Sequence, residues 1–355
     1  MIAGFPCTRG RARVLSFFAF CVLLFVVTNF EWMTGVDFEL SHYPAMQDWI
    51  PIPGMKKMLY GNPDILGATI TFHDLNKLLS QENNAQLKSK KKIPKILFRT
   101  SAVEREKLSV ELQKILVDSK EQNRGYQQVY FNDVDINEFI TNEFPEYIKA
   151  YQSLVPGAYK ADLFRLLALY KYGGIYNDIG HRFLVPIEQL LDANDEFIAA
   201  TEVSRHGSYA HALYNGILAA YPSHPIIKFM IDDIVYTIMH CNYMADPLDI
   251  TGPAAIGRAF NKFMRDWNPG YTGTAPTWDR MPIRRGNYRH KGYQIKLLQH
   301  NPRKEKIYDG VKGVIRTKFP SYYSKIYKEQ GERYDSLWRQ RRVFSESAAC
   351  DGAGK

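Results

Sequence analysis

Three side chains in the middle of the chain have types and spacing suited to chemistry: Asp162, Arg165 and Asp178. Asp162 and Arg165 are three residues apart in a segment of helical composition, so they project from one face of a helix. A carboxylate and a guanidinium presented together can bind the hydroxyls of a polyol or the oxygens of a phosphate. The alternative is that the two side chains form an ion pair with each other within the helix.

The elements around these residues place Asp178 at the end of a strand. The helix is predicted over 158–172, and Gly173 with Gly174 ends it as a left-handed C-terminal cap would. The short strand 175–179 follows. A carboxylate at such a strand end can meet a sugar hydroxyl, a ribose or a hard cation bound to a diphosphate.

The preceding segment alternates between strand and helix patterns. Strands are predicted over 93–99 and 126–131, and helices over 104–123 and 136–144. This alternation predicts an α/β fold with a mostly parallel sheet, in which ligands bind at the carboxyl ends of the strands.

The net charge is unevenly distributed along the 355 residues. The chain has 46 Lys and Arg against 37 Asp and Glu, which gives +9. Residues 93–257 hold 14 basic and 21 acidic side chains, whereas residues 258–343 hold 21 basic and 7 acidic ones. The basic segment indicates either an anionic ligand or acceptor nearby, or simply a basic solvated surface.

The first thirty residues are predicted to form an uncleaved membrane signal-anchor. The alternative is a cleaved signal peptide, although no small-x-small cleavage site follows the apolar run. Residues 14–30 carry no charge and are just long enough to span a thin bilayer as a helix, and the three Arg before them favour a cytosolic N-terminus. The body would then be lumenal, which argues against nucleic-acid binding. In the lumen only Cys241 and Cys350 could pair, and the sequence leaves open whether they do. The expected organisation is a cytosolic tail (1–13), a transmembrane anchor (14–30), a stem (31–92), a catalytic domain (93–344) and a disordered tail (345–355).

The ordered motifs resemble those of a known family. Ala161-Asp162-Leu163-Phe164-Arg165, followed by Tyr172-Gly173-Gly174-Ile175-Tyr176-Asn177-Asp178, is similar to the core of the lumenal glycosyltransferases that carry the DXD sugar-binding region. These include fungal initiating α-1,6-mannosyltransferases and inositol-phosphoceramide mannosyltransferases. The similarity extends over about 93–344 and includes Asn215-Gly216-Ile217 and Thr251-Gly252-Pro253.

This resemblance implies a GT-A type, Rossmann-like nucleotide-sugar-binding domain in a type II Golgi membrane protein. It implies a retaining transfer of a hexose, most readily mannose, from GDP-mannose or a UDP-hexose to a glycan or glycolipid acceptor, with Mn²⁺ or Mg²⁺ as cofactor. Asp162, Arg165 and Asp178 would be catalytic, and Asp178 would also hold the metal. The residues implied in donor binding are Gly173, Gly174, Tyr176 and Asn215.

The sequence departs from the family pattern at Gly180, where the second acid of the DXD motif is expected. Three interpretations are open. The metal is held by Asp178 with the diphosphate, water and a further ligand, for which His181, His206 and His211 are candidates. Alternatively, basic groups replace the metal charge, from the cluster Arg280, Arg284, Arg285, Arg289, His290 and Lys291. In the third interpretation, the protein is a catalytically inactive sugar- or nucleotide-sugar-binding protein on the same fold.

Overall fold

The computed structural model describes residues 91–202, 211–266, 283–290, 292–319, 332–346 and 348. All of these residues belong to one compact unit, Ala68–Lys355. The expected cytosolic tail and anchor, and nearly all of the expected stem, lie outside the described residues. Within the described ranges, no helix has both the length and the apolar character needed to cross a membrane.

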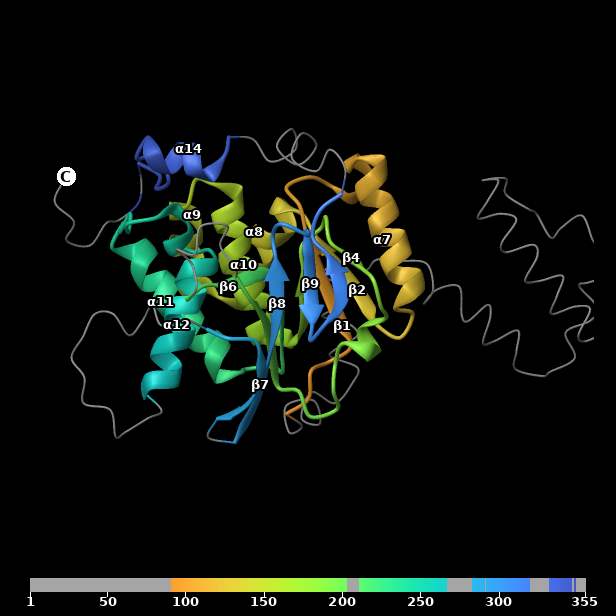
Figure 1. Cartoon of the computed structure of the whole chain (residues 1–355). Coiled ribbons are helices and arrows are strands. Elements are labelled where there is room, and N and C mark those ends of the chain that lie inside the picture. The colour runs from red at the N-terminus through yellow and green to blue at the C-terminus, as the bar shows by residue number, and fades with distance from the viewer. Residues whose placement is uncertain are drawn as a thin grey trace, which may run out of the picture. The chain divides into compact units, whose positions relative to one another are not determined.

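Helices and strands alternate along the first half of the described chain (Figure 1). The strands are β1 (Ile96–Thr100), β2 (Gln127–Phe131), β3 (Gly174–Asn177), β4 (Arg182–Phe183), β5 (Phe197–Thr201), β6 (Leu213–Ala220), β7 (Gly286–His290), β8 (Tyr293–Asn301), β9 (Lys306–Asp309) and β10 (Lys312–Arg316). The α-helices are α7 (Val110–Gln122), α8 (Asp133–Glu143), α9 (Ile148–Ser153), α10 (Gly157–Tyr172), α11 (Pro225–Met239), α12 (Pro253–Asp266) and α14 (Tyr334–Arg339). The 3-10 turn η5 (Pro247–Asp249) precedes α12.

The sheet is mixed, so the prediction of a mostly parallel sheet is wrong. The described strands are ordered β2-β1-β3-β6-β5-β8-β9-β10-β4, and β7 pairs with β8 outside this order. Only β1 with β2, β1 with β3, and β5 with β8 are parallel pairs. Consecutive strands from β7 to β10 are joined by short connections, which can link antiparallel neighbours but not parallel ones.

Several strands nevertheless end at the same end of the sheet. Because β6 is antiparallel to both β3 and β5, the strands β1, β2, β3, β5 and β8 all run in one direction. We call the end where these strands finish the site end. Asp178 follows β3 there, Glu202 follows β5, and His300 lies near the end of β8.

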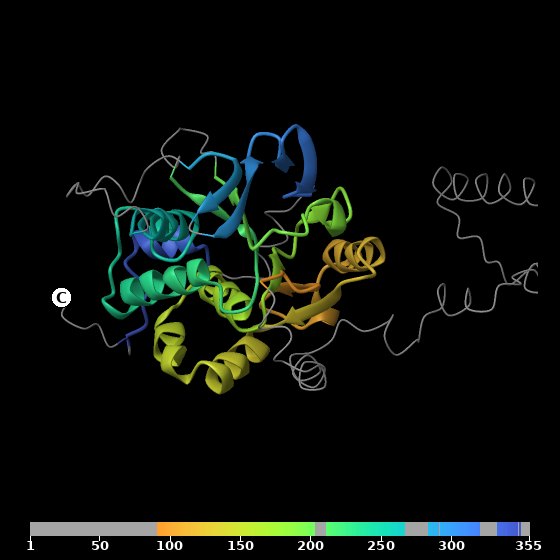
Figure 2. The same cartoon turned by 90° about the horizontal axis from the view of Figure 1, so that it is seen from below.

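The sheet must curve strongly, because β3 and β4 are distant in the pairing order but close in the chain. Five residue steps separate Asn177 from Arg182, a reach of at most about 18 Å. The backbone N–H of His181 donates to the carbonyl of Asp178 over 3.0 Å, so the connection is a tight turn. Figure 2 agrees with this curvature, since the blue strands β8–β10 stand at an angle to the orange strands β1 and β2.

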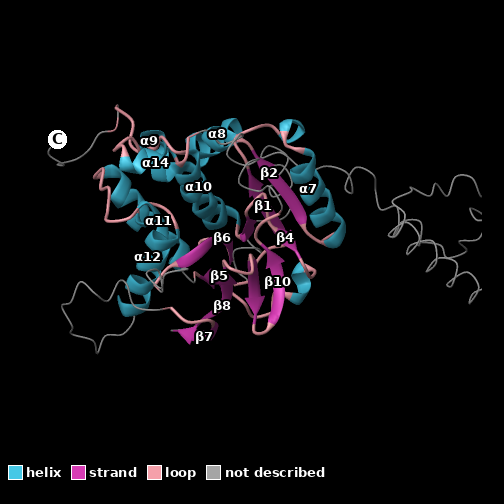
Figure 3. Ribbon diagram, turned by 45° about the horizontal axis from the view of Figure 1, so that its top comes forward, coloured by secondary structure: helices cyan, strands magenta, loops and turns pink. Residues whose placement is uncertain are grey.

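The two faces of the sheet carry different apolar cores. Helices α8, α10, α11 and α12 gather on one side of the sheet and α7 on the other (Figure 3). Phe98 of β1 packs into the helical core, whereas Leu97 packs into a second core inside the curve, with Phe183, Ile307 and Ile315. Both faces of β1 are therefore buried, as expected for a central strand in an α/β domain.

Cys241, just after α11, is disulfide-bonded. It adopts a positive φ of 46°, which is uncommon for a residue with a side chain. The other cysteines of the chain lie outside the described residues. Its partner is therefore a cysteine outside the described residues, where Cys350 lies.

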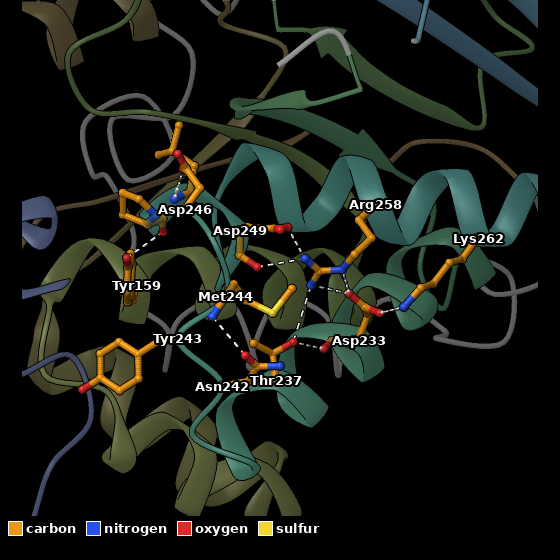
Figure 4. Close-up of polar contacts among 12 residues, drawn as sticks. Tyr159, Asp233, Thr237, Asn242, Tyr243, Met244, Asp246, Asp249, Arg258 and Lys262 are labelled. Atoms are coloured by element: carbon orange, nitrogen blue, oxygen red, sulfur yellow. Dashed lines mark hydrogen bonds and ion pairs between the residues drawn. The ribbon is translucent and has the colours of Figure 1, made fainter. Parts of the chain in front are cut away.

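A buried ionic cluster joins α11, η5 and α12 (Figure 4). Arg258 of α12 forms an ion pair with Asp249 of η5 and donates to the Asp249 backbone carbonyl over 2.9 Å. Its Nη2 also lies 2.7 Å from Asp233 of α11, which Lys262 approaches to 2.7 Å from the other side. The side chains of Arg258 and Asp249 are only 8% and 2% exposed. Because Arg258 binds both the carboxylate and the backbone carbonyl of Asp249, it holds the turn that leads into Thr251 in place, and we call this contact the clamp.

Replacing Arg258 by Met should destabilise the protein much more than breaking a surface pair. The change leaves the buried Asp249 carboxylate without its cation, which costs about 3–5 kcal/mol. The control is Lys228→Met, which breaks an exposed pair with Asp232 and should cost no more than about 1 kcal/mol. Urea unfolding measures both free energies, and equal losses in the two variants would contradict the clamp.

Candidate active site

The guanidinium of Arg165 lies at the centre of the predicted site residues. Its Nη2 is 3.0 Å from Oδ1 of Asp162, and its Nη1 is 3.4 Å from Oδ1 of Asp178. The same Nη1 donates to the backbone carbonyl of Asn215 over 2.6 Å. The guanidinium also lies 4.4 Å from the ring centroid of Tyr176. One buried cation thus links α10, β3, the residue after β3, and β6.

Asp162 is held from several sides. Its Oδ1 accepts from the amide of Asn215 over 2.7 Å, in addition to the Arg165 contact, and its Oδ2 accepts from the hydroxyl of Thr251 over 2.9 Å. Burial raises the pKa of Asp162 to about 6, against the lowering effects of Arg165 and of the hydroxyl and amide donors. The ion pair predicted as an alternative is therefore present, and both carboxylate oxygens face protein donors.

Asp178 is the carboxylate that the site presents to solvent. Its side chain is 28% exposed, compared with 10% for Asp162 and 7% for Arg165. Oδ1 accepts from the hydroxyl of Tyr176 over 3.1 Å and faces Arg165, so the group is oriented by neighbours that are themselves buried. An oriented, accessible carboxylate at a strand end can accept a ligand hydroxyl or contribute to cation binding.

Burial and the neighbouring side chains shift the pKa of Arg165 in opposite directions. Desolvation would lower the pKa of the guanidinium, whereas Tyr176, Asp162 and Asp178 raise it, and the net shift is upward. Arg165 therefore stays cationic at neutral pH. The guanidinium of Arg165 is thus a permanent counter-ion for the Asp178 carboxylate.

A second buried arginine holds the turn that carries Asp178. Nη1 of Arg99 lies 3.2, 3.1 and 3.1 Å from the backbone carbonyls of Asp178, Ile179 and His181. Desolvation lowers the pKa of Arg99 to about 10, which still leaves it charged at neutral pH. Sequence reasoning placed Arg99 at the end of the first strand without a role. The sequence feature that could have indicated its role is a charged residue near the end of a mostly apolar strand.

The two glycines expected to bind the donor lie at the opposite end of β3 from Asp178. Gly173 and Gly174 are at the start of β3, whereas Asp178 follows its end. Their φ angles are +65° and +96°, and a Cβ on Gly173 would lie 2.6 Å from Pro222, while one on Gly174 would lie 2.7 Å from the Ile96 carbonyl. The structure therefore gives these glycines a backbone role, the tight junction between α10 and β3.

An aromatic and imidazole stack borders the site. His181 contacts Asn177 through Nδ1 (2.7 Å) and the hydroxyl of Tyr214 through Nε2 (2.8 Å). The ring of Tyr214 stacks on His300, with ring centroids 4.0 Å apart. Nδ1 of His300 lies 3.0 Å from Glu202, and its Nε2 is buried without a partner. Sequence reasoning did not select Tyr214, His300 or Glu202.

The described side chains do not form a complete cation site. No group of three His, Cys, Asp or Glu side chains with suitable placement occurs in the described ranges. Gly180 supplies no ligand, and both ring nitrogens of His181 already contact Asn177 and Tyr214. Desolvation lowers the pKa of His181 to about 4, so the ring is neutral but fully engaged. His206 lies outside the described residues, and His211 is buried at the start of the segment leading into β6.

Four members of the basic cluster expected to replace the metal are described: Arg284, Arg285, Arg289 and His290. Arg280 and Lys291 lie outside the described residues. Arg289 and His290 pair with Gln294 and Tyr293 at the start of β8, which is the end of the sheet away from Asp178. Arg284 precedes β7 and accepts from the hydroxyl of Tyr288 through its backbone carbonyl, and Arg285 donates to the side chain of Gln299 and the carbonyl of Gly310. Of the described members, Arg289 and His290 therefore lie away from Asp178.

Substituting Gly216 by Ala tests whether Asp178 is positioned by close packing. A Cβ at this position would lie 2.6 Å from Oδ2 of Asp178 and 2.8 Å from the rings of His181 and Tyr214. We expect a lower melting temperature and a displaced Asp178, measured by thermal unfolding and by a crystal structure of the variant. Gly157→Ala is the control, because nothing lies within 4 Å of its Cβ and it should match or exceed the native stability. An undisturbed Asp178 in Gly216→Ala would contradict the packing argument.

The sequence is similar to one family model and to two proteins named as glycosyltransferases. Residues 109–197, which include Asp162, Arg165 and Asp178, match the family model described as "Glycosyltransferase sugar-binding region containing DXD motif". An uncharacterized glycosyltransferase of Acanthamoeba polyphaga mimivirus is 26% identical over 188 residues, which are 53% of this chain and 69% of that protein. Inositol phosphoceramide mannosyltransferase 3 of Schizosaccharomyces pombe is 35% identical over 88 residues, so the match spans about a quarter of each protein (24%).

Two solved structures show a partial likeness. The PaToxG glycosyltransferase aligns with a TM-score of 0.40 at 18% identity, covering 55% of this chain and 79% of that one. The apo form of mouse xyloside xylosyltransferase 1 aligns with a TM-score of 0.30 at 11% identity, covering 48% and 81%. The mixed α/β fold itself is established by the strand order and register described above. From the family match and the two relatives, residues 109–197 are similar to the glycosyltransferase sugar-binding region, with Gly180 in place of the second DXD acid, and the chain is distantly homologous to the viral and yeast proteins.

Proposed function

We propose that this protein is a glycosyltransferase that transfers a hexose, most readily mannose, from a nucleotide sugar to a glycan or glycolipid acceptor. The observation that carries the proposal is the buried network around Arg165, which orients the accessible carboxylate of Asp178 at the site end of the sheet. This network lies within the sugar-binding region matched at residues 109–197 and recruits Asn215 and Thr251 from outside it.

The chemistry of such a transfer suits what these residues provide. A nucleoside diphosphate is a good leaving group, so catalysis depends on positioning and on stabilising charge more than on a strong general acid. Asp178 would contact the donor, and Arg165, Tyr176 and Arg99 would hold Asp178 and its turn in place. Asp162 would act on the donor through this arrangement, since its own oxygens face Arg165, Asn215 and Thr251.

The retaining stereochemistry, the donor and the cellular setting belong to the same proposal. The mannose preference is supported by the yeast relative, which is named a mannosyltransferase and of which this chain matches about a quarter (24%). The uncharged segment 14–30 supports a Golgi type II membrane protein with its catalytic domain in the lumen. GDP-mannose and UDP-hexoses are therefore the first donors to test, with and without Mn²⁺ or Mg²⁺.

Asp178→Asn should lower turnover by at least about a hundredfold, because it removes the oriented charge while keeping the shape of the side chain. The measurement is release of nucleoside diphosphate and of labelled sugar from each donor by the purified protein. Asp118→Asn is the matched control, since Asp118 is an exposed carboxylate on α7. Native turnover in Asp178→Asn would remove Asp178 from the mechanism.

The loss of the second DXD acid at Gly180 supports one alternative, a sugar- or nucleotide-sugar-binding protein without catalytic activity. Calorimetry with GDP- and UDP-sugars separates the two functions. Tight donor binding without transfer or hydrolysis, over a broad acceptor panel and with either cation, would favour the alternative and contradict the transferase proposal.

A further inference from the structure

Three cationic side chains form a row across β4, β10 and β9. Arg316 of β10 lies opposite Arg182 of β4 on one side and opposite Lys306 of β9 on the other. Directly opposed residues on antiparallel strands project from the same face of a sheet and have Cβ atoms about 5 Å apart. Arg182, Arg316 and Lys306, which we call the cationic row, therefore lie side by side.

The cationic row faces away from the apolar core. The neighbouring register positions hold Phe183, Ile315 and Ile307, and all three belong to the core inside the curved sheet. Because successive residues of a strand alternate between faces, the row projects from the opposite, outer face. Arg316 is exposed, and Arg182 and Lys306 are half-buried, so a ligand can reach them.

Among the described residues, no acidic side chain pairs with the cationic row. Over the described part of the chain, none of its members takes part in an ion pair or a side-chain hydrogen bond, and Nε of Arg182 is buried without a partner. Glu305, which precedes Lys306, forms no ion pair with it. Like charges directly opposite each other across strands are destabilising. The three positive charges of the row therefore repel one another in the unliganded protein, which neutral side chains at these positions would not do.

The chain topology brings the cationic row to the site end of the sheet. Arg182 begins β4, directly after the tight turn from Asp178 to His181. Lys306 begins β9 just after β8 has finished at the site end, and Arg316 ends the returning strand β10. The backbone N–H of Thr317 donates to the carbonyl of Glu305 over 2.8 Å, which closes this end of the hairpin.

We propose that the cationic row binds a phosphate group at the margin of the active site. Arg forms paired, charge-assisted hydrogen bonds with phosphate oxygens, and Lys adds a point charge. A bound phosphate would turn the repulsion among the three cations into attraction towards a shared anion. It would also place positive charge near Asp178, where Gly180 leaves the protein without a second acid for a cation.

Two sources could supply this phosphate: the diphosphate of the donor, or a phosphodiester on the acceptor. Phosphate binding by the row does not depend on the proposed function, whereas the choice between the two sources does. The donor source would make the row a partner of the leaving group, and the acceptor source would make it a determinant of acceptor specificity.

The test combines phosphate binding with stability in the absence of phosphate. Inorganic pyrophosphate should raise the melting temperature of the native protein, because a ligand that binds only the folded state stabilises it. Arg316→Gln should weaken pyrophosphate binding at least about tenfold by calorimetry. Without phosphate, at low ionic strength, the same variant should melt no lower than the native protein, because one repulsive charge is gone.

The control is Lys149→Gln, which removes one exposed positive charge from α9. It should keep the native response to pyrophosphate. Arg182→Gln should behave like Arg316→Gln. If Arg182→Gln fails to fold because the Nε of Arg182 is buried, the variants Arg316→Gln and Lys306→Gln still test phosphate binding by the row. A native affinity for pyrophosphate in Arg316→Gln and Lys306→Gln, or no binding by the native protein, would overturn the proposal.

The same titrations distinguish the two sources. A response to GDP or UDP that Arg316→Gln abolishes assigns the row to the donor diphosphate. A response to glycerophosphoinositol that Arg316→Gln abolishes assigns it to a phosphodiester acceptor. Because neither titration requires turnover, a protein that binds phosphate through the row but transfers no sugar would contradict only the proposed function.

Discussion

The buried guanidinium of Arg165 is the interaction on which the rest of the site depends. A cation this deep in a protein is costly unless its donors are matched, and here it is surrounded by Asp162, Asp178, the Asn215 carbonyl and the Tyr176 ring. These partners come from a helix, two strands and a turn. The charge therefore fixes the mutual positions of four segments, and it leaves one of them, the turn with Asp178, facing solvent.

The curved sheet makes this arrangement possible. A turn of only a few residues joins β3 to β4, although the two strands are far apart in the pairing order. Arg99 donates to three backbone carbonyls of that turn, which gives these acceptors a partner within the protein. From the opposite side, the clamp of Arg258 on η5 fixes the approach to Thr251, which completes the contacts of Asp162. The exposed carboxylate is thus supported by two buried arginines in addition to Arg165.

The local part of this account was predictable from sequence. The helix with Asp162 and Arg165, its end at two glycines, and the strand before Asp178 follow from periodicity and turn chemistry over about twenty residues. Arg99, Thr251 and the pair of His300 with Glu202 were not predictable in this way. They meet their partners across 79 to 98 residues of chain. The mostly parallel sheet was expected because the alternation in the first half of the domain was extended to the second half, where hairpins take over.

Calorimetric titration of a nucleotide-sugar panel into the native protein and Arg165→Lys tests the central claim most directly. Lysine keeps the buried charge but cannot reach Asp162, Asp178 and the Asn215 carbonyl together, so Asp178 loses its orientation. The account predicts that at least one donor binds the native protein and binds Arg165→Lys at least about tenfold more weakly, with an unchanged circular dichroism spectrum. Equal donor affinity in the two proteins would contradict it.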